Sequence, residues 1–416
     1  MKSNGEMTRS IRLATTAAAL AGLASIASCG AAPTEVDQIE TTTSALTCSP
    51  ACGTGRTCYA TNVCAWTAGT IQNLQTALQN HQTEIVVLTA DLNASSFSWH
   101  VPYFAGVLDG QGHTISNLTA TDNPFIASAG MIGLGSFATI KNLKLTNLRS
   151  TGASSAGGLV GDCDGCMIDS VAVEGTVNAP SYVGGVLGGM NAGTVTKTYF
   201  KGTVTGGDQA AGGLVGLAYD NGIDLATITN CYAQAVNQTS TLVAGNTTAG
   251  IHPAGGIVGA GAGMSVFDIY AIGAVTGRGS SGGLIGKATC EADGFSWLLY
   301  KGIYRGNVTD SNLGWAGVVG QAVDAYCLGR IANLYYNSDL DRDTNASPAV
   351  GQRRSTGAEL TWPTAPTAAN GGIFCQSGNP DLPCGDNGMS DPPWDFGTSS
   401  QNNVLRNMPG PNVQIR

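Results

Sequence analysis

Short apolar words bounded by glycine recur along this chain at nearly equal intervals. The clearest copy is AGGLVG at residues 156–161. With the glycine before the apolar pair taken as the anchor, the copies stand at Gly130, Gly158, Gly185, Gly213, Gly256, Gly283 and Gly317. Their spacings are 28, 27, 28, 43, 27 and 34 residues. A period near 27 residues with occasional insertions is typical of a solenoid in which each repeat forms one coil.

The stretch after each word alternates apolar residues with polar or small ones. Examples are MIDSVAVEGTV at residues 167–177 and SVFDIYAIGAV at residues 265–275. β-Branched and aromatic residues are frequent there, so these stretches are predicted to be short strands. One coil of about three such strands cannot bury its own apolar face, so neighbouring coils must stack at about 4.8 Å per coil. The sequence therefore predicts an all-β solenoid of about seven or eight coils across residues 67–350.

Both ends of such a stack need cover, because an exposed sheet edge invites aggregation. Ile71, Leu74, Ala77 and Leu78 fall at helical spacing, which predicts a short amphipathic helix that caps the N-terminal end. Beyond the repeats, prolines interrupt any regular pattern. Residues 351–416 are therefore predicted to form an irregular C-terminal cap.

The first 28 residues have the pattern of a secretion signal. Lys2, Arg9 and Arg12 precede an uncharged, apolar run over residues 13–27. This run is shorter than the roughly 20 residues that a membrane-spanning helix needs.

The signal ends in IASCG at residues 26–30, which resembles the lipobox of bacterial lipoproteins. The resemblance implies that the signal is cut before Cys29 and that this cysteine carries the lipid. An ordinary secretory signal is the alternative. Gly30 does not match the aspartate of the inner-membrane retention signal, so the outer membrane or the cell surface is expected. Residues 29–47 are polar and aperiodic, and are predicted to be a flexible tether.

The composition is acidic and poor in charge. The 416 residues carry a formal net charge of −9, with 11% charged residues and 59 glycines. An acidic surface argues against nucleic acid as a partner. The chain also lacks a basic patch for anionic lipid, so attachment to the membrane is expected to depend on the N-terminal lipid.

Twelve cysteines suit an oxidising compartment. Cys48, Cys52, Cys58 and Cys64 lie close together and predict a disulfide-rich segment, residues 48–66, with two bridges in one of three connectivities. A zinc site is the alternative for these four. The other candidate pairs are Cys163 with Cys166, Cys290 with Cys327, and Cys375 with Cys384.

Cys231 remains after these pairings and is expected to be a buried free thiol. For Cys163 and Cys166 a redox-active pair is the alternative to a structural bridge, although no thioredoxin-like context surrounds them.

Residues 85–133 resemble the opening of the GLUG-motif family of bacterial surface proteins. The resemblance rests on LTADL at residues 88–92 and FAGVLDGQGHTI at residues 104–115. The named motif matches GLVG at residues 158–161 and 213–216 and GLIG at residues 283–286, with variants at the other anchors. The family implies a right-handed parallel β-helix. Such repeats occur in adhesins and in the non-catalytic parts of IgA-cleaving metallopeptidases, and no activity attaches to the motif itself.

Catalytic signatures are scarce. The sequence contains no His-Glu-x-x-His, no Gly-x-Ser-x-Gly elbow and no phosphate loop. His113 lies in the LDGQGHTI word and is expected to be structural. A β-helix enzyme that acts on polysaccharide needs carboxylates on one stacked face. The acids that follow glycine words are Asp162, Asp164, Asp220, Asp224, Glu291 and Asp293. Solvated turn residues are the alternative interpretation of this set.

Asp339, Asp341 and Asp343 are the best metal candidates, because alternating acids place oxygen atoms on one side of a loop, as calcium requires. The stretch lacks the glycine at its sixth position and the glutamate at its twelfth that an EF-hand loop has. An exposed turn is the alternative, and no other cofactor is expected.

Two functions from different classes fit these observations. The favoured one is a lipid-anchored, non-catalytic β-helix for adhesion, surface display or glycan binding, with a glycan or another cell-surface protein as its partner. The other is a β-helix lyase or glycoside hydrolase. Three or more acids gathered with a basic residue in a cleft would indicate the enzyme. Insertions such as residues 238–251 are expected to form loops on the binding face.

Overall fold

The computed structural model describes the repeat region and a few residues beyond it. The chain divides into two compact units, residues 1–45 and 46–416, and every described residue lies in the second unit. The described residues are 48–122, 126–237, 239–248, 250–289, 299–311, 316–322, 331–337, 352–354, 394–395 and 404–405.

Some predictions fall outside these residues and stay predictions. They concern the signal and tether over residues 1–47, most of the cap over residues 351–416, the acids Glu291 and Asp293, and the residues Cys29, Cys290, Cys327, Asp339, Asp341, Asp343, Cys375 and Cys384.

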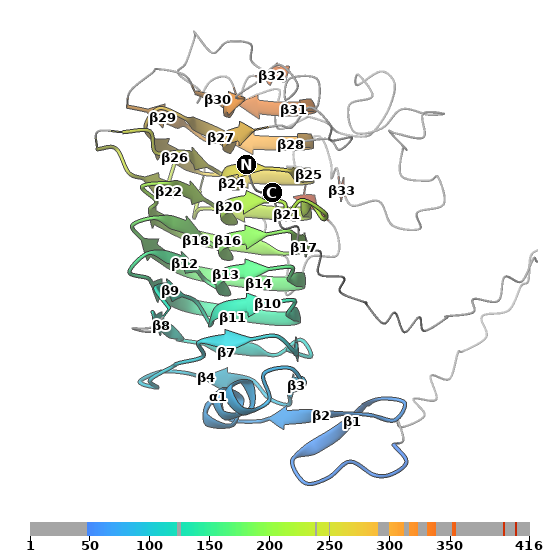
Figure 1. Ribbon diagram of the computed structural model, residues 1–416. Coiled ribbons are helices and arrows are strands. Elements are labelled where there is room, and N and C mark those ends of the chain that lie inside the picture. The colour runs from blue at the N-terminus through green and yellow to red at the C-terminus, as the bar shows by residue number, and fades with distance from the viewer. Residues whose placement is uncertain are drawn as a thin grey trace, which may run out of the picture. The chain divides into compact units, whose positions relative to one another are not determined.

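The described residues are organised almost entirely as strands (Figure 1). The larger sheet has 19 strands: β1 (Arg56–Ala60), β2 (Val63–Ala68), β3 (Ile85–Leu88), β4 (Leu92–Asn93), β6 (Val107–Asp109), β7 (Thr114–Ser116), β8 (Thr119–Thr121), β11 (Thr139–Thr151), β14 (Met167–Ala179), β17 (Gly193–Thr196), β18 (Tyr199–Gly206), β21 (Ala226–Gln234), β22 (Thr241–Gly245), β25 (Met264–Ile272), β26 (Ala274–Gly277), β28 (Leu299–Arg305), β29 (Val308–Asp310), β31 (Ile331–Asn337) and β32 (Gln352–Arg354).

The second sheet contains the glycine words. Its 13 strands are β5 (Tyr103–Phe104), β9 (Ser128–Ala129), β10 (Ile132–Ser136), β12 (Ser155–Gly157), β13 (Val160–Asp164), β15 (Tyr182–Gly184), β16 (Leu187–Asn191), β19 (Ala210–Gly212), β20 (Val215–Tyr219), β23 (Ala254–Gly255), β24 (Val258–Ala262), β27 (Ser281–Thr289) and β30 (Ala316–Ala322). A separate antiparallel pair joins β33 (Trp394–Asp395) to β34 (Val404–Leu405).

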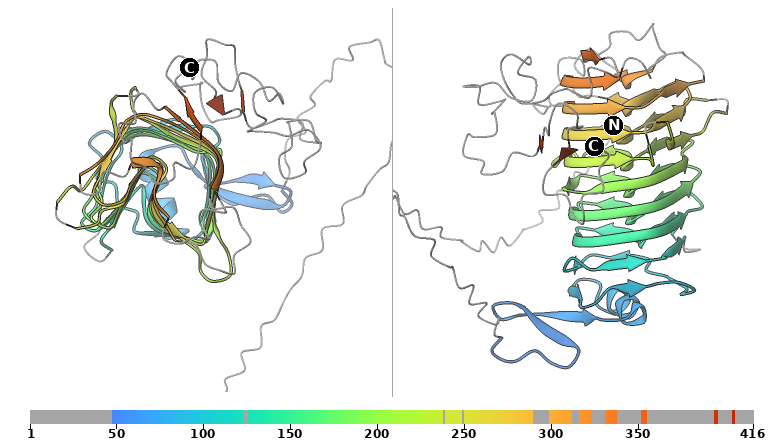
Figure 2. Two further views of the ribbon diagram at one scale, coloured as in Figure 1. Left: turned by 90° about the horizontal axis from the view of Figure 1, so that it is seen from above. Right: turned by 180° about the vertical axis from the view of Figure 1, so that it is seen from behind.

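Strands pair in parallel with their counterparts one repeat later. Phe200 of β18, for example, lies beside Val173 of the coil before it and beside Ala233 of the coil after it. Viewed along the stack, the coils superimpose (Figure 2). The all-β prediction is confirmed, and the coils stack as the period predicts. Side chains that point inward from both sheets form one continuous apolar core.

The glycine words line up in a row along the second sheet. The first glycine of each full word pairs with its equivalent, in the order Gly157, Gly184, Gly212, Gly255 and Gly282. The last word is one residue shorter than the full words, and Gly317 pairs with Gly282 rather than following the anchor Gly283. The first word is short in the same way, because Ala129 pairs with Ala156 while Ile132 pairs with Val160. Gly130 and Gly317 therefore occupy the place of the first glycine, one position before the other anchors.

The helix α1 (Ile71–Asn80) lies at the N-terminal end of the stack, against β2, β3 and β5. The Thr70 side chain caps it by accepting a hydrogen bond from the backbone N–H of Asn73 at 3.2 Å. Its apolar face is buried through Ile71, Leu74, Ala77 and Leu78. No helix among the described residues is both long and apolar enough to span a bilayer.

Candidate binding face and pocket

The glycine words bring two strand columns of the second sheet side by side. Between β12 and β13 the chain bends at Gly158 and Leu159, and a methyl group at Gly157 would lie only 2.0 Å from the carbonyl oxygen of Val160. The bend buries both Leu159 and Val160 completely, which explains why each word carries two adjacent apolar residues. The polar side chains that precede and follow a word are thereby placed within reach of one another.

Asp162 is held by serines that belong to two different coils. The Ser155 hydroxyl donates to Oδ1 of Asp162 at 3.1 Å, and the Ser128 hydroxyl of the coil below donates to Oδ2. Both serines are buried. Asp164 accepts a hydrogen bond from the Asn191 amide at 2.9 Å. Both carboxylates thus have neutral donors, and no ion pair joins either to a basic side chain in the described part of the chain.

Two tyrosines lie beside these carboxylates. Tyr219 is 42% exposed, and its pKa is raised first by burial and then by the negative charges of Asp162 and Asp164. The Tyr182 hydroxyl donates to the Gln209 side chain at 2.6 Å. We call Asp162, Asp164, Tyr182, Asn191 and Tyr219 the aspartate face.

Gly189 provides the floor of the aspartate face. It pairs with Asp162 on one side and with Leu217 on the other. A methyl group at Gly189 would lie 2.6 Å from Oδ1 of Asp162. A side chain at this position would therefore press on the carboxylate of Asp162.

A small pocket, with room for about one water molecule, lies next to the aspartate face. Ser128 belongs to its lining and also donates to Asp162, so the two features are continuous. The indole N–H of Trp99 donates to the carbonyl oxygen of Met131 at 2.7 Å, which fixes that wall. The lining residues are Trp99, His100, Val101, Pro102, Thr121, Ser128, Gly130 and Gly133.

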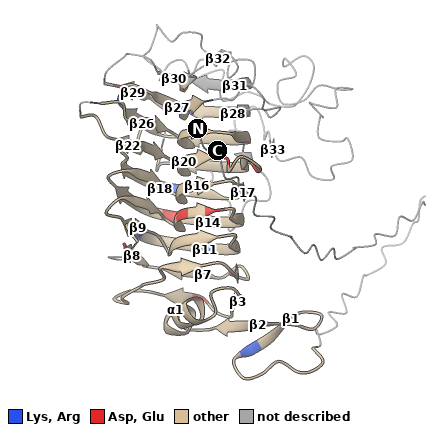
Figure 3. Cartoon of the chain, in the orientation of Figure 1, with Lys and Arg blue, Asp and Glu red and all other residues tan. Residues whose placement is uncertain are grey.

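Among the described residues, no basic side chain links the other candidate acids to the aspartate face. Asn221 accepts backbone hydrogen bonds from Ile223 and Asp224, so Asp224 belongs to a tight exposed turn. Lys287 is in the same row as Asp162 but four pairings along, roughly 19 Å at 4.8 Å per coil. In the view of Figure 3, few of the described residues are coloured as charged.

The LDGQGHTI word has a structural role. Nδ1 of His113 lies 3.2 Å from Oδ1 of Asp91, which also accepts from the backbone of Thr114. The buried Asp109 accepts from the backbone of Gln111 at 2.9 Å and from the Tyr59 hydroxyl at 2.9 Å. These contacts connect the first coils and the N-terminal hairpin.

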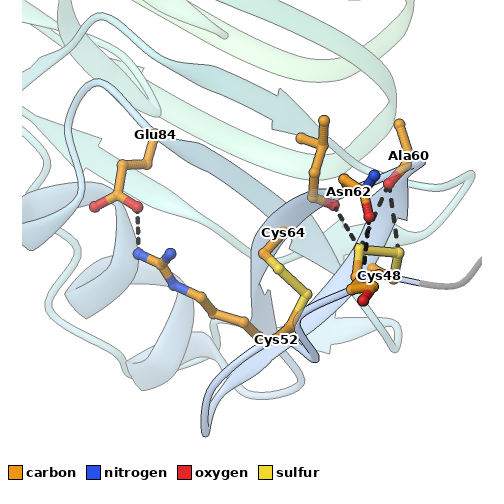
Figure 4. Close-up of a disulfide and its surroundings, with 10 residues drawn as sticks. Cys48, Cys52, Ala60, Asn62, Cys64 and Glu84 are labelled. Atoms are coloured by element: carbon orange, nitrogen blue, oxygen red, sulfur yellow. Dashed lines mark hydrogen bonds and ion pairs between the residues drawn. A yellow bond between two sulfur atoms is a disulfide. The ribbon is translucent and has the colours of Figure 1, made fainter.

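The four clustered cysteines form two bridges, Cys48–Cys58 and Cys52–Cys64 (Figure 4). This is one of the three connectivities that the sequence leaves open, and it occupies the sulfur atoms that the zinc alternative would need. The bridged hairpin is no separate module, because β2 pairs in parallel with β3 and begins the coil stack.

Glu84 docks the hairpin onto the first coil. Its carboxylate pairs with Arg56 and accepts from the Trp66 indole N–H at 3.0 Å, and His81 Nδ1 lies 3.0 Å away. The Trp66 and His81 rings stack at 3.7 Å between centroids. Glu84 therefore joins three side chains at the junction.

Acid is expected to loosen this junction. The hydrogen bond from Trp66 lowers the pKa of Glu84 below its ordinary value of 4.5, and His81 and Arg56 act in the same direction against a smaller effect of burial. Because the pKa of Glu84 is lower in the folded state, its ionised carboxylate stabilises docking above the unfolded-state pKa. This stabilisation is lost as the pH falls through the folded-state pKa. The protection of amides in residues 56–68, measured relative to the intrinsic exchange rate at each pH, should fall below about pH 4.5. Glu84→Gln should show low protection already at neutral pH. Protection that does not change with pH in the native chain would contradict this assignment.

The remaining described cysteines behave as the sequence predicts for a structural role. Cys163 and Cys166 are bridged, and both are buried. Cys231 is the free thiol among the described cysteines; it is fully buried, and burial raises its pKa to about 12. A thiol held in this form is a poor nucleophile.

Comparisons with known proteins agree with the repeats. Residues 207–237 match the family model of the GLUG motif, which confirms the predicted resemblance. Halomucin of Haloquadratum walsbyi (strain DSM 16790 / HBSQ001) is 36% identical over 141 residues. This match covers 27% of the chain and only 2% of halomucin, so the chain spans a small part of that relative. The motif and the halomucin match favour a cell-surface protein.

Two solved structures show a more distant likeness. A proposed immunoglobulin A1 protease from Bacteroides ovatus has a TM-score of 0.47 at 15% identity, with 82% of this chain and 92% of that chain covered. A structure named IgA1 Protease has a TM-score of 0.43 at 18% identity, with 65% and 21% covered. Neither likeness supports a conclusion about activity.

Proposed function

We propose that this chain is a non-catalytic surface protein, held to the membrane by a lipid on Cys29, whose aspartate face binds a glycan. The observation that carries the proposal is the arrangement around Gly189. Gly189, which has no side chain, pairs with Asp162, and Tyr219 lies close enough to Asp162 and Asp164 for their charges to raise its pKa. Sugar hydroxyl groups donate to carboxylates, and the C–H faces of sugar rings pack on aromatic rings.

Sequence features near the N-terminus support the proposed location at the membrane surface. The lipobox-like IASCG word provides the anchor, and residues 29–47 provide a tether to hold the coils away from the membrane. The coils are proposed to wind with the right hand, the hand that nearly all parallel crossover connections take.

A polysaccharide lyase or glycoside hydrolase remains the second candidate, because Asp162 and Asp164 share one face of β13. A glycosidase needs one of its two acids to hold a proton for the leaving group. Here both oxygens of Asp162 accept hydrogen bonds from serine hydroxyls. The nearest lysine in its row is four pairings away. These contacts favour binding over catalysis.

A glycan array with the mature chain tests the proposal. Tyr219→Ala should weaken binding to any glycan retained by about tenfold, the loss expected for one aromatic contact of roughly 1.4 kcal/mol. Gly189→Ala should weaken it as well, because the added methyl group would lie against the Asp162 carboxylate. The matched control Asp91→Asn changes an exposed carboxylate between β3 and β4 and should leave binding intact. Binding that Tyr219→Ala and Gly189→Ala leave unchanged would exclude the aspartate face, and release of oligosaccharides from a polysaccharide would support the enzyme.

A further inference from the structure

Three tyrosines form a stacked ladder on the larger sheet. Tyr199, Tyr232 and Tyr270 pair in register on β18, β21 and β25. Neighbouring rings are parallel, with centroids 4.7 Å apart in both steps. Their side chains are 0%, 0% and 2% exposed. Their burial needs an explanation, because these side chains point away from the apolar core.

The ladder faces away from the core. Phe200, Ala233 and Ala271 directly follow the tyrosines and belong to the apolar core. Since alternate residues of a strand point to opposite faces, the tyrosines point outward. Charged side chains on the same face also indicate that it points away from the core. The Tyr199 hydroxyl donates to Glu174 at 2.9 Å, and Glu174 pairs with Lys144 at 3.0 Å.

The buried area extends beyond the ladder. Gln234 and Ile272 lie two residues further along β21 and β25, also on the outward side, and are 0% and 2% exposed. We call Tyr199, Tyr232, Tyr270, Gln234 and Ile272 the tyrosine face. Among the described elements, β21 packs mainly against β17, β18 and β25 of its own sheet. None of these lies over the outward side of β21.

The end of the chain is the segment best suited to cover this face. Of the residues described after Arg354, Trp394–Asp395 and Val404–Leu405 pair with each other and not with a coil. The 62 residues from 355 to 416 contain the large apolar side chains that such a cover needs, namely Trp362, Phe374, Trp394 and Phe396.

Charge favours the same segment. Residues 355–416 carry five acidic and two basic side chains. The margins of the tyrosine face carry Lys144, Lys201 and the buried Arg305 against one acid, Glu174, which pairs with Lys144. We propose that residues 355–416 fold back along the side of the coils and cover the tyrosine face, so that this segment is a lateral cover and does more than close the end of the stack.

Photocrosslinking in the full chain identifies the occupant. With p-benzoylphenylalanine in place of Lys201, at the margin of the tyrosine face, the expected cross-linked peptide comes from residues 355–416. The same probe in place of Thr119, an exposed residue of β8 in the first coils, is the control and should not give this product. A cross-link from Lys201 to residues 1–47, to residues 290–298 or to a second copy of the chain overturns the proposal.

Nitration gives an independent measurement. In the intact chain the three ladder tyrosines should react at least about tenfold more slowly than the exposed Tyr219. A protease site placed at Gly357 and cut after folding should let the ladder react once the released peptide is removed, while Tyr219 stays unchanged. A released peptide that stays bound to the coils also supports the proposal. Ladder reactivity that does not change after the peptide has left overturns it.

Discussion

Gly283→Ala is expected to destabilise the coils around it by about 3 kcal/mol, at the upper end of the range for overpacked cores. A methyl group at Gly283 would lie 2.3 Å from Cδ1 and 2.4 Å from Cγ of Tyr304, far inside van der Waals contact. The Tyr304 side chain is buried, and its hydroxyl donates to the carbonyl oxygen of Gly273 at 3.0 Å, so the ring cannot swing away freely. Amide exchange in β25, β27 and β28 should accelerate, together with a lower midpoint of thermal unfolding.

Two further variants isolate the cause. Gly53→Ala is the matched control, because a methyl group there meets nothing within 4 Å, and it should leave stability nearly unchanged. Tyr304→Ala alone should cost about 3–5 kcal/mol through its cavity. In the double variant the methyl group at residue 283 enters that cavity, so the combined loss should be clearly smaller than the sum of the two single losses. Additive losses would show that the glycine is needed for another reason.

The double substitution Cys52→Ser and Cys64→Ser is expected to cost the N-terminal hairpin about 3 kcal/mol. The bridge closes a loop between residues 12 apart, and the stabilisation by a disulfide of this loop size is about that large. Because β2 pairs directly with β3, loss of the hairpin also exposes the edge of the first coil. Limited proteolysis within residues 56–68 and amide exchange in β3 should both accelerate.

The Cys163–Cys166 bridge, which follows a glycine word, provides a comparison for the Cys52–Cys64 bridge. Cys163→Ser with Cys166→Ser removes a disulfide between residues three apart, which closes a much smaller loop. Its loss should affect exchange in β13 and β14 and leave the hairpin protected. Equal sensitivity of the hairpin to both double substitutions would show that the Cys52–Cys64 bridge has no local role.

The stacking of coils could be predicted because its cause is repeated in the sequence. The five anchors of the full words, Gly158, Gly185, Gly213, Gly256 and Gly283, each face a core side chain of the larger sheet. The column opposite contains Val173, Phe200, Ala233, Ala271 and Tyr304. The glycine is needed whichever residue stands opposite, so it recurs while its partner varies. The alternation of apolar residues follows from the same geometry, since one side of each strand always faces the core.

One corner of the coil could not be predicted in this way. Asn142, Ser170, Lys197, Asn230 and Asp268 stand at equivalent positions and all have positive φ, between 46° and 56°. Asparagine and aspartate favour this left-handed region, whereas lysine and serine do not. All five residues adopt the conformation here, so no single residue type marks the corner.

The aspartate face was visible only in part. Asp162 and Asp164 stood out as acids after a glycine word, but the serines that hold Asp162 did not. A signal existed, because Ser128, Ser155 and Ser280 each stand two residues before the first glycine of a word. Pairing between coils brings Ser128 to Asp162, 34 residues further along the chain. Such a separation leaves no local pattern to recognise.

The register of equivalent residues has a consequence for how such a chain can evolve. A coil touches its two neighbours, and it carries both the small residue and the bulky one that must fit together. Unequal recombination that duplicates or deletes one full unit therefore leaves each contact between neighbouring coils made by the same kinds of residue. Gene variants of different length should remain foldable when they differ by whole units, and fail when the change breaks a unit part-way.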